Sequence, residues 1–200
     1  YVGAARKMLR GEASNNEHPP LVKALIALGI LSLGDIPLGW RMFSIVTSSA
    51  SLALLYALAL LLSGQKDVSF FASFLYAVDV MCFNIGQIAM LDGPAMTFVL
   101  AASVCLLKGR YDLGGVFLGL ASLCKLSVVF VAAGLILFLF VTEAFQHKKT
   151  IMACLRSSSA SLLRTFLVGL VVFLLGFWLY DSSYGVFGNN PLKHFAYMFA

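Results

Sequence analysis

Residues 43–62 read FSIVTSSASLALLYALALLL, a run of twenty residues without a charged side chain. At about 1.5 Å per residue, a helix of this length spans the roughly 30 Å hydrocarbon core of a bilayer. The rest of the chain has the same character, because hydrophobic residues make up 60% of it, charged residues 12%, and the mean hydropathy is +0.93. The sequence therefore predicts an all-α, multi-pass membrane protein and argues against a soluble domain.

Four further apolar stretches follow toward the C-terminus, at residues 68–89, 93–107, 111–142 and 165–180. The stretch 111–142 is too long for one ordinary crossing and short for two. If it divides at Cys124-Lys125, the basic loop residues gather on one side of the membrane, as the positive-inside rule requires. We therefore predict six spans within residues 41–181. The basic side would carry Lys66, Lys108, Arg110, Lys148, Lys149, Arg156 and Arg164.

That orientation places four segments outside the cytoplasm: residues 1–40, the turn at 88–93, the turn at Lys125, and the tail 182–200. In residues 1–40 we predict two amphipathic juxtamembrane helices, at 1–11 and 21–34. The second helix is short, contains Lys23, and follows a Pro-Pro pair that suits a helix start. Residues 1–40 thus form a first external loop, 41–181 a six-span transmembrane region, and 182–200 the start of the next external loop.

The net charge and the cysteine positions argue against several classes of function and of site. The net charge of +5 is explained by membrane topology and gives no indication of nucleic-acid binding. Cys82, Cys105, Cys124 and Cys154 are scattered singly through apolar sequence, so neither a disulfide framework nor a zinc site is expected. The chain opens at Tyr1 without a Met, and we expect it to be a piece of a longer protein.

The strongest local signal of a site is Asn16-Glu17-His18-Pro19-Pro20-Leu21, a polar, proline-stiffened stretch beside a membrane. The topology gathers Arg41, Asp92 and Lys125 at the same face. Two of these positions also have structural explanations. The Arg41 side chain could simply extend to the membrane–water interface, and Asp92 could be the N-cap of the next helix. Asp79, within residues 68–89, is expected to hydrogen-bond a neighbouring helix.

Carboxylates and cations together at the outer face suit chemistry on a lipid-linked phosphate donor. A phosphate leaving group needs Arg or Lys to stabilise its charge, and an acceptor hydroxyl needs a carboxylate base. A divalent ion held by acidic residues could assist. An ion-coupled transporter would instead place charges near the middle of broken helices and carry an internal repeat, and we find no repeat.

Four stretches occur in the order that one enzyme family uses: Tyr1-Val2-Gly3-Ala4-Ala5-Arg6, Glu17-His18-Pro19-Pro20-Leu21-Val22-Lys23, Gly39-Trp40-Arg41 and Ile88-Ala89-Met90-Leu91-Asp92. Lys125 and Asn190-Pro191-Leu192 fit the same pattern. On these motifs the chain resembles the dolichyl-phosphate-mannose protein O-mannosyltransferases, over all 200 residues but only the N-terminal half of such an enzyme. The pair Gly86-Gln87 departs from the family, whose members often carry Ser-Arg there.

The resemblance implies the type C glycosyltransferase membrane fold and inverting transfer of mannose from a polyprenyl-phosphate donor to a hydroxyl, with protein Ser/Thr as the leading acceptor. It implies catalytic roles for Asp92 and Glu17, with the main base in an acidic pair upstream of Tyr1, so that this piece by itself would be inactive. It implies substrate binding by His18, Arg41 and Lys125. Glu17 and His18 could also hold a divalent metal, the one cofactor considered.

Two alternatives remain open from the sequence. One keeps the polyprenyl-phosphate donor but moves the sugar to a lipid or a glycan acceptor. The other, of a different class, is a membrane transporter or a non-catalytic scaffold. In every enzymatic interpretation the partners are the donor, an acceptor and the bilayer, without nucleic acid. The active face would lie outside the cytoplasm, at a prokaryotic plasma membrane or in the endoplasmic reticulum.

Overall fold

The computed structural model of the chain describes residues 1–14, 16–146 and 151–198. Within these ranges the chain forms α-helices and one short 3-10 helix, with no strand, so the predicted all-α class is confirmed. In chain order the elements are α1 Val2–Leu9, α2 Leu21–Leu33, α3 Pro37–Ser63, α4 Lys66–Val78, α5 Val80–Gln87, α6 Asp92–Leu107, α7 Tyr111–Cys124, α8 Val128–Gln146, α9 Ile151–Tyr184, η1 Phe187–Asn189 and α10 Pro191–Tyr197.

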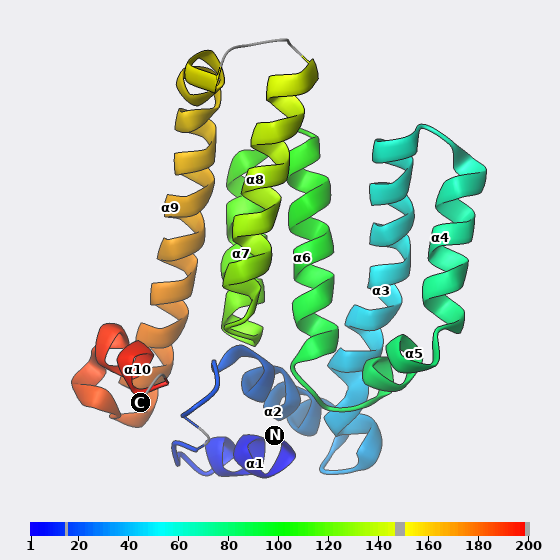
Figure 1. Cartoon of the computed structure of the whole chain (residues 1–200). Helices are drawn as coiled ribbons and strands as arrows, with labels where there is room; N and C mark the ends of the chain where they lie inside the picture. Colours follow the sequence, from blue (N-terminus) through cyan, green and yellow to red (C-terminus); the bar gives the residue numbers. More distant parts are fainter. Residues whose placement is uncertain (15, 147–150, 199–200) are drawn as a thin grey trace.

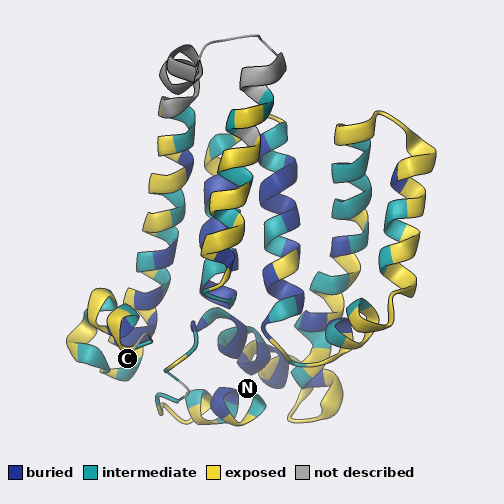
Figure 2. Ribbon diagram, in the orientation of Figure 1, coloured by how far each residue is buried: buried dark blue, intermediate teal, exposed yellow. Residues whose placement is uncertain are grey.

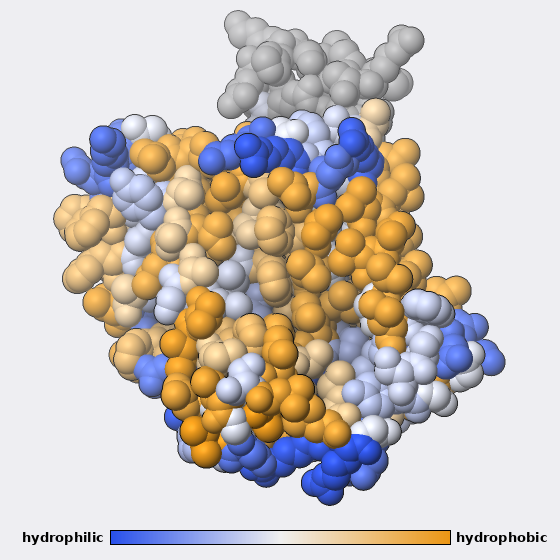
Figure 3. Space-filling model, turned by 180° about the vertical axis from the view of Figure 1, so that it is seen from behind, coloured by the Kyte–Doolittle hydropathy of each residue, from blue (hydrophilic) through white to orange (hydrophobic). Residues whose placement is uncertain are grey.

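The helices α3, α4, α6, α7, α8 and α9 run side by side as a bundle, and α1, α2, α5 and α10 gather at one end of it (Figure 1). The four segments that the charge pattern assigns to one face therefore lie at the same end, as predicted. Seen from behind, apolar side chains cover the middle of the molecule and hydrophilic ones lie toward its two ends (Figure 3). This distribution suits a bundle that sits in a bilayer.

By length and composition, α3 and residues Ala160–Tyr184 of α9 can each cross a membrane, and α4 with α5 adds a third crossing if the bent pair is one span. In the described part of the chain, α6, α7 and α8 are apolar but shorter. The six crossings and the division at residues 40 and 181 stay predictions.

The long stretch 111–142 is divided where the sequence analysis divides it. Helix α7 ends at Cys124 and α8 begins at Val128. Each helix is therefore an arm of a sharp reversal, and Lys125 lies in the turn between them, at the end of the bundle that carries α1 and α2 (Figure 1).

Residues 68–89 are not one continuous helix, which corrects the sequence analysis. The chain bends by 64° between α4 and α5. Asp79 lies at the break, where its carboxylate accepts a hydrogen bond from the backbone N–H of Cys82 at 2.7 Å. It therefore caps the helix that follows it and does not bond a packed neighbour, because the unsatisfied N–H groups of a new helix need an acceptor.

Helix α2 also differs from the amphipathic pattern expected of it. Its charged residue, Lys23, is buried, whereas Leu28 and Leu31 are exposed. One face of α2 packs against the bundle and the opposite face is apolar too. The second juxtamembrane helix is therefore a short apolar element in which the charge is turned inward.

Small residues hold the bundle together. Gly115 and Gly119 of α7 lie against α9, where a side chain at Gly119 would come within 2.6 Å of the Gly169 carbonyl and 2.7 Å of the Val172 Cβ. In a bilayer, helices gain stability from close packing because the lipid is as apolar as their side chains. The result is an interior centred on α6 and α7, while α4 is exposed along most of its length (Figure 2).

A matched pair of glycine substitutions tests this packing. Gly119→Ala should lower the thermal unfolding temperature, because overpacking costs roughly 1–3 kcal/mol. Gly134→Ala, on α8, places its new methyl group in open space and should raise stability slightly, by up to about 1 kcal/mol. The measurement is thermal unfolding of the full-length protein in detergent. Equal stability of the two variants would contradict the proposed α7–α9 contact.

Candidate functional site

The centre of the candidate site is an ion pair between Asp92 and Lys125. Asp92 is the first residue of α6, and Lys125 directly follows α7. The Lys125 Nζ lies 2.5 Å from the Asp92 Oδ1, and both side chains are partly exposed. The N-cap of α6 is Leu91 and no side chain caps the helix, so the interpretation of Asp92 as an N-cap is wrong. Its carboxylate still lies in the first turn, where the helix dipole favours a negative charge.

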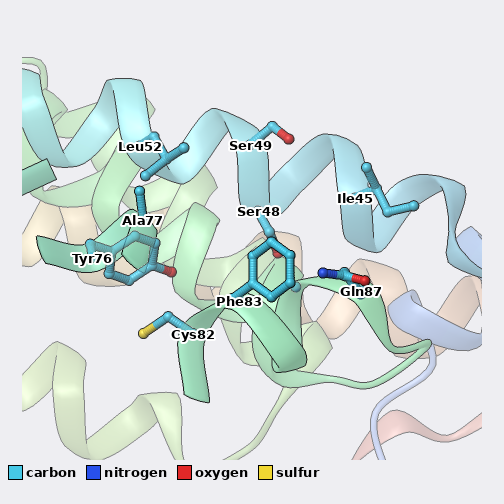
Figure 4. Close-up of a pocket in the computed structure, with 10 residues that line it drawn as sticks. Ile45, Ser48, Ser49, Leu52, Tyr76, Ala77, Cys82, Phe83 and Gln87 are labelled. Carbon is cyan, nitrogen blue, oxygen red and sulfur yellow. The ribbon is translucent and has the colours of Figure 1, made fainter. Parts of the chain in front are cut away.

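The pair lines a cavity of about 290 Å³ whose other walls are mostly apolar. A second cavity, of about 430 Å³, lies between α3, α4 and α5, and Ser48, Tyr76, Cys82 and Gly86 belong to both. Figure 4 shows Ser48 from α3, Tyr76 from α4 and Phe83 from α5 around this second cavity. The two cavities adjoin at the four residues they share and are together called the α3–α5 groove below; their lining is mostly apolar, and the Asp92–Lys125 pair lies in the smaller one.

Tyr1 connects this pair to His18. The rings of Tyr1 and His18 have centroids 5.5 Å apart. Burial raises the pKa of Tyr1, and the Asp92 charge acts in the same direction while Lys125 opposes it, so Tyr1 lies within the field of the pair. Tyr1 also packs on the buried cluster that contains Leu91, directly before Asp92. Tyr1 was not among the predicted site residues, although it opens the first of the four family-like stretches.

Glu17 and Arg41 lie apart from these groups. Both are exposed, and neither side chain makes an ion pair or hydrogen bond with any described residue. Asp35, the acid that precedes Arg41 in the sequence, accepts from Arg6 at 2.9 Å and from the Trp40 indole at 2.5 Å. The structure thus brings Asp92 and Lys125 together, connects His18 to their field only through Tyr1, and leaves Glu17 and Arg41 exposed at the same end.

Metal binding by Glu17 and His18 stays a prediction. Within the described residues, no group of three or more His, Cys, Asp or Glu side chains gathers around one point. Glu17 and His18 are neighbours in sequence and could supply two ligands. Further ligands would have to come from a substrate, from water or from outside the described residues.

A second polar cluster, which the sequence analysis missed, lies behind the Glu17-His18 stretch. The Lys23 side chain is 1% exposed, and its ammonium group donates to the backbone carbonyls of Ser14 and His18, each at 3.2 Å. It also lies 4.8 Å from the centre of the Tyr180 ring. The available signal is a lysine inside the apolar stretch 21–34, a pattern that also fits a helix at the membrane interface.

Burial lowers the pKa of Lys23 to about 8, from an ordinary value of 10.5. Below about pH 8 the amine is protonated in both states, and the folded state bears the cost of burying the charge. Between about pH 8 and pH 10.5 the unfolded chain binds the extra proton, so folded-state stability rises with pH.

Replacement of Lys23 tests whether the stability of the folded state rises with pH in this range. Relative to Lys23→Met, the wild-type protein should gain stability as the pH rises from about 8 toward 10, by up to about 3 kcal/mol. Lys7→Met, an exposed lysine on α1, is the control and should show no such trend. The measurement is the unfolding temperature of full-length protein over this pH range. A constant difference between wild type and Lys23→Met would contradict the burial of the charge.

The sequence of the chain matches a protein-family model and individual known proteins. The sequence model of a family described as dolichyl-phosphate-mannose-protein mannosyltransferase matches residues 17–178. A polyprenol-phosphate-mannose–protein mannosyltransferase of Corynebacterium glutamicum is 35% identical over 96 residues, which is 48% of this chain and 18% of the relative. A protein of the same name from Mycolicibacterium smegmatis is 33% identical over 93 residues, 46% of this chain and 18% of that protein. The matched stretch is therefore less than a fifth of the length of these relatives.

A solved structure matches in fold. It is the Saccharomyces cerevisiae protein O-mannosyltransferase Pmt1-Pmt2 complex bound to the sugar donor. The TM-score is 0.78 at 22% sequence identity, and the match covers 92% of this chain and 30% of that one. The predicted membrane fold is thereby confirmed over nearly the whole chain.

Proposed function

Because the chain belongs to the dolichyl-phosphate-mannose-protein mannosyltransferase family, we propose that the full-length protein transfers mannose from a polyprenyl-phosphate carrier to a hydroxyl group of a protein. The observation that carries the proposal is the Asp92–Lys125 pair in the smaller cavity of the α3–α5 groove. The names of the two bacterial relatives support the donor and the protein acceptor.

The shape of the groove suits an amphipathic donor. A prenyl chain gains free energy by lying against apolar walls, at roughly 25 cal/mol per Å² of buried surface. Its phosphate must stay near a cation, and Lys125 supplies one in the cavity that it lines with Asp92. Arg41, exposed at the same end of the bundle, is a second cation that can approach the phosphate from the surface.

The reaction that we propose inverts the configuration at the anomeric carbon. The acceptor hydroxyl forms the new C–O bond, the bond from that carbon to the phosphate oxygen breaks, and the electron pair leaves with the polyprenyl phosphate. Lys125 stabilises the charge that develops on this phosphate. Asp92 holds Lys125 in place for this role, and the hydroxyl proton passes to a carboxylate base, for which the resemblance implies the acidic pair upstream of Tyr1.

Glu17 and His18 flank this reaction from the external loop. We propose that they contact the acceptor or the phosphate, because the His18 ring packs near Tyr1 and Tyr1 lies within the electrostatic field of the ion pair. If a divalent ion is required, these two residues would hold it, and the ion would neutralise phosphate charge. Transfer by the full-length enzyme in the presence of a chelator decides whether it is.

We propose further that the site faces away from the cytoplasm. Lys66, Lys108, Arg110 and Arg164 lie toward the opposite end of the bundle, and positively charged loops favour the cytoplasmic side. The external end would then receive acceptors outside the plasma membrane or inside the endoplasmic reticulum.

Substitutions in the ion pair test the catalytic proposal. Lys125→Met and Asp92→Asn should each lower mannose transfer by the full-length enzyme about a hundredfold, because one electrostatic contact to the transition state is typically worth this much. The assay measures transfer from polyprenyl-phosphate-mannose to a Ser/Thr peptide. The matched control is Asp112→Asn, which removes a second interhelical ion pair, with Arg164, at the opposite end of the bundle. It should leave transfer within about twofold.

The outcomes separate the alternatives. Full activity of both pair variants would show that the site lies elsewhere. Transfer from the same donor to a lipid or a glycan, with none to peptide, would show that the acceptor is not a protein. Loss of activity in Asp112→Asn equal to that in Lys125→Met would indicate that the Asp92–Lys125 pair acts only by holding the helices together.

Cysteine labelling tests the orientation. In intact cells, a membrane-impermeant maleimide should label Glu12→Cys, in the external loop, and should not label Lys108→Cys, at the opposite end, until the cells are opened. Both positions are exposed, so accessibility does not limit the reaction. The reverse labelling pattern would place the site on the cytoplasmic side.

A further inference from the structure

A buried acid–histidine pair ties the end of α9 and α10 to the first external loop. Asp181 and His194 are both fully buried, and the His194 Nδ1 lies 2.6 Å from the Asp181 Oδ1. The other ring nitrogen, Nε2, lies 3.0 Å from the backbone carbonyl of Asn16, the residue directly before Glu17. One imidazole thus contacts both segments, which are 178 positions apart in the sequence.

The partners of the ring fix where its protons lie. A carbonyl oxygen only accepts hydrogen bonds, so Nε2 must carry a proton and donate it to Asn16. One further proton then lies between Nδ1 and Oδ1, on whichever atom holds it. Whether this is a carboxylic acid with a neutral ring or a carboxylate with a protonated ring, the pair has no net charge.

The second carboxyl oxygen, Oδ2, favours the form in which Asp181 is a carboxylic acid and the His194 ring is neutral. The Asp181 Oδ2 is buried and has no hydrogen-bond partner among the described residues. An unpaired oxygen of a buried carboxylate is much more costly than the carbonyl oxygen of a carboxylic acid. An asparagine at this position would reproduce the acid, with its amide N–H donating to Nδ1 and its carbonyl oxygen in the place of Oδ2.

Two more buried groups hold the same stretch. The Tyr180 hydroxyl donates to the Asn16 side-chain oxygen at 2.9 Å. Lys23 donates to the carbonyl of His18, on the far side of Glu17. Asn16 and His18, which flank Glu17 in the sequence, are therefore each held by interior side chains, while the Glu17 side chain between them stays exposed.

From these contacts we infer that Asp181, His194 and Tyr180 form a clasp that positions the Glu17-His18 stretch against the Asp92–Lys125 pair. They are positioning residues, because none of them lines the cavity at that pair. The consequence for turnover rests on the proposed function, whereas the position of the loop does not. Through the clasp, the position of the Glu17-His18 stretch depends on the segment that follows α9.

The test uses the full-length protein and two readouts. The first is mannose transfer, separated into kcat and the KM for polyprenyl-phosphate-mannose. The second is the rate at which a maleimide labels Glu17→Cys in a background without other cysteines, and it reports loop position independently of catalysis. The variants are His194→Phe, Asp181→Asn and Tyr180→Phe. The control is Lys193→Ala, an exposed neighbour of His194 on α10.

We expect His194→Phe to lower kcat by about ten- to a hundredfold, with little change in the donor KM, because misplacement by about an ångström can cost this much. Labelling at position 17 should become severalfold faster. Asp181→Asn should keep both readouts near wild type, and Lys193→Ala should change neither. Tyr180→Phe keeps the ring over Lys23 and loses only the hydroxyl, so it gives an intermediate effect and remains informative if His194→Phe fails to fold.

Three results would overturn the inference. Unchanged labelling and kcat in both His194→Phe and Tyr180→Phe would show that the clasp does not position the loop. Loss of kcat in Asp181→Asn with normal labelling would indicate that Asp181 transfers a proton. A rise in donor KM alone in His194→Phe would indicate a donor contact. Absence of mannose transfer by the wild-type protein would refute the proposed function, while the labelling rates would still test the clasp.

Discussion

The cost of burying charge in a bilayer organises this molecule. An ionised side chain at the centre of the membrane costs roughly 2.5–3.5 kcal/mol on insertion scales, so charges move to the helix ends or into pairs. Asp92 and Lys125 meet at one end of the bundle, and Asp112 and Arg164 meet at the other. The bundle between them is held by close packing of small residues, such as Gly119 of α7 against Gly169 of α9. Polar chemistry is therefore possible at the ends only, and the turns decide which groups meet there.

The candidate site follows from that arrangement. Lys125 reaches Asp92 because α7 ends at Cys124 and the chain reverses into α8. The α3–α5 groove lies next to the pair because the chain bends by 64° at Asp79, which turns α5 across the end of α3 and α4 (Figure 1). A straight helix over residues 68–89 would not place Cys82 and Gly86 in the wall shared by the two cavities. A broken helix thus supplies a mostly apolar groove that contains a charged pair, which is the form an amphipathic phosphate donor needs.

The segments at the end of the bundle that carries α1 and α2 depend on one another in a similar way. The stretch with Glu17 and His18 is short and polar, and it has little apolar surface with which to fix itself. It is held by side chains from α2, α9 and α10: Lys23, Tyr180 and His194. Each of these residues is buried, and each donates a hydrogen bond to a main-chain or amide oxygen of the loop. Buried polar groups need such partners, so the interior and the loop order each other.

The sequence by itself determined the all-α membrane class, the helix break near Lys125 and the end of the bundle at which the candidate residues lie, because hydropathy, length and the positions of basic residues are local properties. It also selected Asp92 and Lys125, as charges in turns between apolar helices. It did not determine that these two form an ion pair, that Tyr1 joins them to His18, or that Glu17 and Arg41 remain exposed. The bend at Asp79 and the contacts of Lys23 and His194 were likewise decided by the tertiary structure. The physical reason is that hydropathy records whether a residue prefers lipid or water, whereas the partner of a buried lysine or histidine is set by helices distant in sequence that pack against it.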